Sequence, residues 1–297
     1  MRVKGRRRMG RLTLFSVLVL FVALSACAPV PSREETQPHA SDQRIDRSVD
    51  GKKTANRGSE PSTPRLAGGP ERAVRLPAPM TLADLRHKYP NIFILNGPSS
   101  KRQVALSFDD GPDRTFTPRI LDVLREHGVK ATFFVIGNRV AAHPDVVARM
   151  VREGHVVGSH SWDHPNLAKL GPDKVREQLV RAEDAIYRVA GYRPRLFRPP
   201  YGSIQESGIL EARDLGYTIV NWNVDSLDWK GLSAEQVATN VLAHVYPGSI
   251  ILLHSAGGEG SDLEGTVRAL PEIIRRLKAD GVTFVTVPEL LDLPYKK

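Results

Sequence analysis

The stretch QVALSFDDGP, residues 103–112, decides the fold because an apolar, strand-like run ends in two adjacent acids. Asp109 and Asp110 close the run, and Gly111 and Pro112 follow at once. Neighbouring side chains of a regular strand point to opposite faces, so both acids can serve one site only where the strand breaks. Gly and Pro permit such a break, although an ordinary polar turn has the same composition. Because like charges this close repel, we expect one of the carboxylates to find a cation.

This strand begins a regular alternation of strand and helix patterns. Strand-like runs lie at 103–108, 130–137, 155–160, 196–200, 217–224, 249–254 and 282–287. Helical patterns lie between them at 117–128, 144–154, 172–191, 206–215, 233–244 and 262–279, and a short helix and strand precede them within 80–95. Alternating βα units predict an α/β fold with parallel strands and helices outside. About seven such units predict a barrel or a barrel-like sheet.

Polar motifs follow the ends of five of these strands. They are DD (109–110), HSWDH (160–164), RPPYG (198–202), DSLDW (225–229) and His254. In a parallel β/α barrel the carboxyl ends of the strands share one rim. Residues far apart in the sequence are therefore expected to converge on one site.

The HSWDH motif indicates a metal site. On a helix, the spacing of His160 and His164 would put both imidazoles on one face, as would also be true of an ordinary surface pair. Two His and one carboxylate of the DD pair leave coordination positions open, as catalytic zinc sites do. The same ligands could hold ferrous iron in an oxygenase. The second carboxylate would then be free to accept a proton from an attacking water.

The three remaining motifs each allow a catalytic and an ordinary interpretation. Arg198 offers a planar fork that suits a carboxylate, or it is a surface arginine in a stiff loop. Taken alone, DSLDW is a turn with a partly buried Trp, and His254 is a core histidine. A carboxylate beside His254 would instead keep it protonated as an acid.

The motifs SFDDGP, HSWDH, RPPYG, DSLDW and LLH, in this order, resemble the five motifs of the polysaccharide deacetylases, carbohydrate esterase family 4 with its NodB-homology domain. The resemblance covers residues 101–295. It implies a distorted (β/α)7 barrel with parallel strands inside and helices outside. It also implies metal-dependent removal of N-acetyl groups from a glycan. Ser107 stands where the family commonly has Thr, and we expect its side chain not to be needed for the chemistry.

The resemblance implies a role for each residue of the first three motifs. Asp109 is the general base, and Arg198 orients it. Asp110, His160 and His164 bind the metal, usually zinc, although cobalt and other divalent ions also serve.

The last two motifs supply the acid and the substrate contacts. The resemblance implies that His254 is the general acid, which protonates the leaving amine. Asp225 is the first candidate for its carboxylate partner, and Asp228 is the second. Trp229 and Leu252 are implied to line a pocket for the acetyl methyl. The backbone N–H near Tyr201, together with the metal, is implied to stabilise the oxyanion.

The first 27 residues have the pattern of a bacterial lipoprotein signal peptide. A basic segment precedes an apolar run of 13 residues, 12–24, which is shorter than the ~20 that a membrane-spanning helix needs. Cys27, the single cysteine of the chain, ends the sequence LSAC, which resembles a lipobox. We expect Cys27 to carry a lipid that anchors the protein to the membrane, outside the cytoplasm. An ordinary secretory signal, which gives a secreted protein, is the alternative.

Residues 28–79 contain no aromatic residue and cannot bury enough apolar surface to fold. We expect a disordered tether with a reach of about 40 Å, followed by the catalytic domain at 80–297. The net charge is +9, but residues 101–297 carry 25 basic and 25 acidic side chains. The folded part therefore has no charge excess to attract nucleic acid, and we expect no nucleic-acid partner. We expect a monomer.

The sequence thus predicts a hydrolase that removes N-acetyl groups from an extracytoplasmic glycan. The anchor and tether favour N-acetylglucosamine or N-acetylmuramic acid in peptidoglycan. Chito-oligosaccharides, a surface poly-N-acetylglucosamine and O-acetylated xylan stay open. Two alternatives belong to other classes: a catalytically silent glycan-binding lipoprotein and a ferrous oxygenase.

Overall fold

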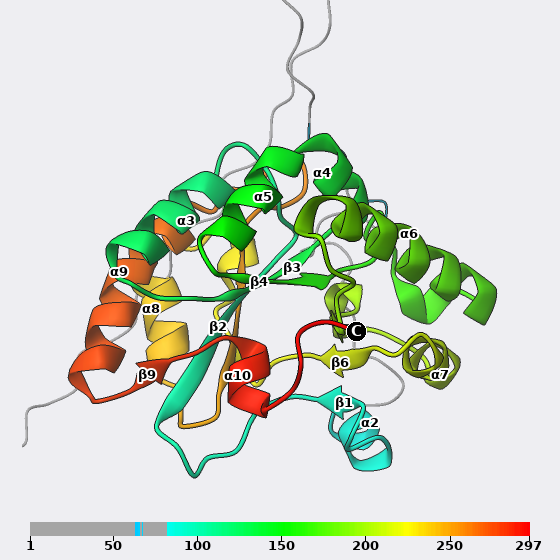
Figure 1. The fold of residues 1–297 in the computed structure, drawn as a ribbon. Coiled ribbons are helices and arrows are strands. Elements are labelled where there is room, and N and C mark those ends of the chain that lie inside the picture. The colour runs from blue at the N-terminus through cyan, green and yellow to red at the C-terminus, as the bar shows by residue number, and fades with distance from the viewer. Residues whose placement is uncertain (1–62, 66, 68–81) are drawn as a thin grey trace, which may run out of the picture. The chain divides into compact units, whose positions relative to one another are not determined.

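The computed structural model describes residues 63–65, 67 and 82–297 (Figure 1). The predicted signal peptide, Cys27 and most of the predicted tether lie outside the described residues. Among the helices that are described, none combines the length and the apolar character needed to cross a bilayer.

Nine parallel strands form one curled sheet with helices around it (Figure 1). The strands are β1 (Phe93–Ile94), β2 (Gln103–Asp109), β3 (Thr132–Val135), β4 (Val156–Ser159), β5 (Leu196–Phe197), β6 (Thr218–Val220), β7 (Val224–Asp225), β8 (Ile250–His254) and β9 (Thr283–Phe284). Their order is β1-β6-β5-β4-β3-β2-β8-β7, and β9 pairs with the first residues of β2. Because β1 and β7 are the two edges, the barrel-like sheet is open between them. The predicted α/β fold with parallel strands inside is confirmed in this half-barrel form.

The helices match the predicted patterns, and two more are present. They are α2 (Leu82–Lys88), α3 (Thr117–Glu126), α4 (Gly137–Ala142), α5 (Pro144–Arg152), α6 (Pro172–Ala190), α7 (Glu206–Asp214), α8 (Ala234–Leu242), α9 (Glu264–Ala279) and α10 (Val287–Leu291). Short 3₁₀ turns occur at Leu167–Lys169, Pro200–Gly202 and Asp228–Lys230. α6 begins at Pro172, whose missing N–H is not needed in a first turn, and ends at Gly191, which adopts a left-handed φ of 76°. The short helices α4 and α10 were not predicted.

The central strands are buried on both faces, which explains their unbroken apolar sequence. All four residues of β3, TFFV, are buried, and helices cover the outer side of the sheet. Phe108 of β2 stacks on Phe133 of β3 with ring centroids 5.1 Å apart. Parallel strands covered on both sides are expected to show such runs rather than an alternation.

The predicted strand at 217–224 is in fact two strands with different partners. β6 pairs with β1 and β5, whereas β7 pairs with β8 at the opposite edge. Asn221 donates its N–H to Ile94 O and Asn223 donates its N–H to Ile250 O, so the intervening segment crosses the open side of the sheet. The prediction of a single strand was wrong because strand propensity does not reveal which neighbour a strand pairs with.

Four residues of the predicted tether are described, and each contacts the folded domain. Thr63, Pro64, Arg65 and Ala67 contact His143, Arg139, Glu259 and Asp163, respectively. These contacts place residues 63–65 and 67 against α4 and its C-terminal end, and against the loops that follow β4 and β8.

Candidate active site

The carboxyl end of β2 brings both acids of the DD pair to one place. Asp109 is the last residue of β2, and Asp110 leaves the strand with a left-handed φ of 68°. This break turns the second side chain toward the first. His160 Nε2 consequently lies 3.7 Å from Asp109 Oδ2 and 3.4 Å from Asp110 Oδ1. The predicted strand break after the apolar run is confirmed.

Asp110, His160 and His164 form a buried cluster whose donor atoms all lie within 4.8 Å of one another. His164 Nε2 is 3.2 Å from Asp110 Oδ1. The two histidines do not lie on a helix. His160 directly follows β4, and the loop after it turns through Ser161 and His164, which adopt φ values of 67° and 63°.

The other ring nitrogen of each histidine is already engaged. His160 Nδ1 lies 2.7 Å from the carbonyl oxygen of Arg198, to which it donates, and His164 Nδ1 lies 3.1 Å from the Tyr201 hydroxyl. These contacts fix both rings with Nε2 toward Asp110, as in metal sites where a second contact orients each ligand.

The cluster has the chemistry of a divalent-cation site. Asp110 Oδ1 and His160 Nε2 are buried and have no hydrogen-bond partner among the described residues. Buried polar atoms without partners are costly, and a shared cation removes that cost. A carboxylate with two imidazoles is a donor set that suits zinc with coordination positions left open. The residues present therefore fit a metal.

The charges within the cluster stabilise one another. Burial alone would raise the pKa of Asp110, but the neighbouring His164 and His160 outweigh it and hold that pKa well below its usual range. Burial alone would lower the pKa of His160, but Asp109 and Asp110 outweigh it and raise that pKa above its ordinary value. Without a metal, His160 therefore keeps its proton up to a higher pH than a free imidazole does. A metal that binds His160 must displace this proton.

Arg198 holds Asp109 in place. Its Nη1 donates to Asp109 Oδ1 at 2.7 Å, and Nε and Nη2 donate to the carbonyl oxygens of Val220 and Asn221 at 2.9 and 3.0 Å. The guanidinium is fully buried, so these contacts fix its plane. Arg198 is thus a buried partner of Asp109 and not a surface residue of a stiff loop.

Ser107 has a positioning contact that the sequence did not indicate. Its hydroxyl accepts from Arg198 Nη2 at 2.9 Å and donates to the carbonyl oxygen of Ile251 at 2.7 Å. A Thr would carry the same hydroxyl, so a Ser here preserves the contact.

The carboxylate partner of His254 is Asp228. Asp228 Oδ1 lies 2.7 Å from His254 Nδ1, and Asp228 Oδ2 accepts the backbone N–H of His254 at 2.8 Å. Asp225, the first candidate from the sequence, instead accepts the N–H of Leu227 at 2.9 Å and shapes the turn. The ranking of Asp225 above Asp228 was therefore wrong. Leu227 adopts a left-handed φ of 56°, and the chain turns here between Asp225, which lies in β7 opposite Leu252, and Asp228, which binds His254.

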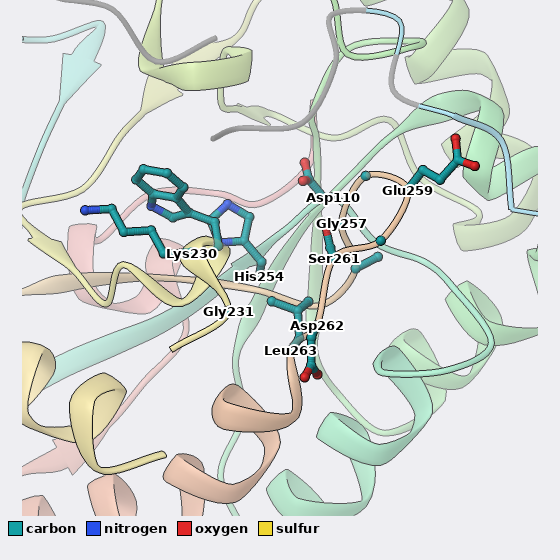
Figure 2. Close-up of a pocket in the computed structure, with 13 residues that line it drawn as sticks. Asp110, Lys230, Gly231, His254, Gly257, Glu259, Ser261, Asp262 and Leu263 are labelled. Carbon is teal, nitrogen blue, oxygen red and sulfur yellow. The ribbon is translucent and has the colours of Figure 1, made fainter. Parts of the chain in front are cut away.

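A cavity of about 240 Å³ opens beside this pair. Asp110, Trp229 and His254 line it together with the loop 256–263. Figure 2 shows Lys230 and His254 on one side, and Gly257, Ser261 and Glu259 on the other. Leu252 is buried in β8, two residues before His254 and on the same face of the strand. Tyr201 has a φ of 60° and is mostly buried beside His164.

Sequence reasoning missed Arg139 of α4. This side chain is only 2% exposed and donates to the carbonyl oxygens of Asp110 and Gly257, both at 2.8 Å. The one signal in the sequence is a cation within the apolar run FFVIGNRV, residues 133–140, where a buried charge needs partners.

Known proteins are similar to this chain in sequence and in fold. The family model for polysaccharide deacetylase matches residues 96–220. A peptidoglycan-N-acetylglucosamine deacetylase of Bacillus cereus is 48% identical over 198 residues, which cover 67% of this chain and 71% of that protein. The peptidoglycan-N-acetylglucosamine deacetylase PgdA of Listeria monocytogenes is 42% identical over 192 residues, 64% of this chain but only 39% of that longer protein.

A solved crystal structure has a fold similar to that of this chain. The crystal structure of the Bc1960 peptidoglycan N-acetylglucosamine deacetylase, in complex with 4-naphthalen-1-yl-N-oxidanyl-benzamide, superposes with a TM-score of 0.69 at 45% identity. The match covers 72% of this chain and 99% of that one.

The curled parallel sheet thus brings a carboxylate–arginine pair, an Asp–His–His cluster and a His–Asp pair together at one rim. The chain belongs to the polysaccharide deacetylase family and, like the deacetylases named above, is a hydrolase that acts on N-acetyl amide bonds.

Proposed function

We propose that this protein is a metal-dependent N-deacetylase that removes acetyl groups from the N-acetylated sugars of peptidoglycan. The observation that carries the proposal is the geometry around Asp110: a three-residue cation site lies within 4 Å of a second carboxylate, Asp109, which a buried arginine orients. The names of the relatives support the cell-wall substrate.

Asp109 acts as the general base. The Arg198 guanidinium binds Asp109 Oδ1, so Asp109 Oδ2 faces the cluster and accepts the proton of an attacking water. Asp110, His160 and His164 would hold a divalent cation, which would supply polarisation of an acetamide carbonyl and acidification of water. Zinc is the first choice of metal on ligand chemistry, and cobalt is a substitute.

His254 acts as the general acid. Asp228 holds Nδ1, which leaves Nε2 directed away from that contact and available to donate a proton to the leaving nitrogen. The amide bond then breaks, and free amine and acetate are the products. Asp228 stays ionised because the neighbouring His254 outweighs the effect of burial and lowers the pKa of Asp228.

Three residues contact the substrate in this proposal. Trp229 lines the cavity, and we assign the apolar seat for the acetyl methyl to Trp229 together with Leu252, a buried residue of β8 that is not among the residues lining this cavity. The backbone N–H near Tyr201 donates to the oxygen that gains negative charge in the transition state.

The cellular context follows from the N-terminal sequence. Lipidation of Cys27 anchors the protein to the outer surface of a bacterial membrane, and residues 28–79 extend the catalytic domain, 80–297, toward the wall. The domain acts as a monomer on glycan and has no nucleic-acid partner.

Acetate release by the full chain tests the proposal. Peptidoglycan and chitopentaose are each incubated with the wild-type protein, with a chelator, and with zinc restored after chelation. We expect acetate from peptidoglycan, its loss on chelation and its return with zinc. Glycan binding without acetate release would support the silent glycan-binding lipoprotein, and turnover that depends on both iron and oxygen would support the oxygenase.

A further inference from the structure

Arg139 is a buried cation whose donors all point to main-chain oxygens. Nη1 donates to Asp110 O at 2.8 Å, Nη2 to Gly257 O at 2.8 Å and Nε to Pro64 O at 3.1 Å. No described carboxylate lies within ion-pair distance of it. A guanidinium buried in this way depends on the three carbonyl groups for compensation, and its planar fork fits three acceptors at once.

Two of these carbonyl groups belong to opposite parts of the candidate site. Asp110 is a proposed metal ligand in a left-handed turn, and Gly257 begins the loop that lines the cavity. Figure 2 shows Asp110 and Gly257 close together at the cavity wall. The loop sequence GGEG, residues 257–260, has three glycines and little rigidity of its own. An external contact is therefore needed to fix its position.

The third carbonyl group belongs to the segment before the domain. Pro64 O completes the donor set of Arg139, and Ala67 N–H donates to Asp163 O in the HSWDH loop at 2.6 Å. This segment thus contacts the residue that fixes the metal-ligand turn and also the loop that carries both histidines.

We propose that Arg139 is a positioning residue that sets the separation between the metal-ligand turn at Asp110 and the cavity loop at Gly257. This inference rests on the proposed function, because it assigns the turn to a metal and the loop to substrate. Arg139 touches neither of them. It acts by holding two backbone oxygens, which couples metal affinity to the shape of the cavity.

Arg139→Lys in the full chain tests the inference, because lysine keeps the charge but cannot span three carbonyl groups in one plane. The matched control is Arg149→Lys in α5, since Arg149 also donates to a main-chain oxygen, Pro118 O at 3.2 Å, but its partners Pro118, Asp122 and Glu153 all lie outside the candidate site. The measurements are zinc affinity by chelator competition, amide hydrogen exchange of residues 257–262, and kcat and KM for acetate release at saturating zinc.

We expect Arg139→Lys to bind zinc at least about 10-fold more weakly, as for other residues that orient metal ligands. We also expect faster exchange in the loop and a KM raised at least about 5-fold with kcat changed less, because uniform binding is lost. The control should stay within about twofold of the wild type in each measurement. A variant with lower thermal stability but unchanged zinc affinity and loop exchange would show a purely structural role and overturn the inference. A change in zinc affinity without a change in loop exchange, or the reverse, would also overturn the inference.

Gly257→Ala keeps the test decisive if Arg139→Lys does not fold. An added Cβ would lie 2.5 Å from the Ser261 Cβ and so displaces the Gly257 carbonyl while Arg139 stays intact. Zinc affinity should fall at least about 3-fold although residue 257 donates nothing to a metal, and an unchanged affinity would contradict the coupling. Zinc affinity and hydrogen exchange need no substrate, so a wild-type protein that releases no acetate would refute the proposed function and leave the test of Arg139 valid.

Discussion

Asp228→Asn removes the negative charge that the structure places on His254 and leaves the shape of the side chain. In the wild-type protein, Asp228 Oδ1 lies 2.7 Å from His254 Nδ1, while Oδ2 accepts from the His254 N–H and from Thr266 Oγ1, both at 2.8 Å. The oxygen of an Asn can still accept from the backbone and from Thr266. The amide nitrogen then faces His254 Nδ1, where it can only donate, so the imidazole loses both the negative charge and the acceptor for its Nδ1–H.

The loss follows from the strength of that one contact. A hydrogen bond to a charged group contributes about 1.5–3 kcal/mol, and ~1.4 kcal/mol corresponds to a tenfold change in rate. The kcat for acetate release should therefore fall about 10- to 150-fold. Because a neutral Asn stabilises the protonated imidazole less, the alkaline limb of the pH–rate profile should also move to lower pH.

The assay is steady-state acetate release from peptidoglycan across pH, with zinc content and thermal stability measured on the same samples. Asp225→Asn is the matched control, since its oxygen can still accept the Leu227 N–H, and we expect a loss below about fivefold. If Asp225→Asn lost activity and Asp228→Asn kept it, with both variants folded, the assignment of the His254 partner would be refuted.

Four further substitutions test the site, the fold and the anchor. Asp109→Asn should lower kcat about 10²- to 10⁴-fold with zinc content unchanged, and loss of zinc instead would mean that the roles of the two acids are reversed. His160→Ala should lose both zinc and activity, and full activity in this variant would be incompatible with the proposed metal site. Burial lowers the pKa of His155 from 6.5 to about 4. As the pH falls, His155 therefore binds a proton in the unfolded chain before it does so in the folded protein. About 3 kcal/mol of the free energy of unfolding should consequently be lost between pH 6.5 and 4. Urea unfolding of His155→Gln should show a flatter pH dependence in that window, and an equal slope would contradict this account. Cys27→Ser should abolish metabolic labelling with palmitate, and unchanged labelling would exclude the lipid anchor.

The order of elements and the rim of polar motifs were predictable because they depend on local patterns. Asp109 and Asp110 end an apolar run at Gly-Pro, a composition that permits a broken strand with two carboxylates on one side. The parallel topology then brings the ends of distant strands together. The choice between Asp225 and Asp228 was not predictable in the same way. It depends on the left-handed turn at Leu227, a residue type that rarely adopts that conformation.

Contacts with main-chain oxygens leave no signal in the residue types on the acceptor side. Arg139 has three backbone oxygens as acceptors, and any residue in their place would offer the same carbonyl group. The split of 217–224 into two strands was hidden for a related reason. Both halves are strand-like, and the difference is only in the edge of the sheet that each one joins.

Arg198 links the base to the scaffold, and this has a consequence for how activity appears when the chain folds. One guanidinium contacts Asp109 and Ser107 of β2 and the carbonyl oxygens of Val220 and Asn221 at the end of β6. Until these distant strands have docked, the base has no partner to orient it. Recovery of acetate release after dilution from denaturant should thus follow the docking of β6 and lag behind the recovery of the helical circular-dichroism signal. The rate at which activity returns would then report the last stage of refolding.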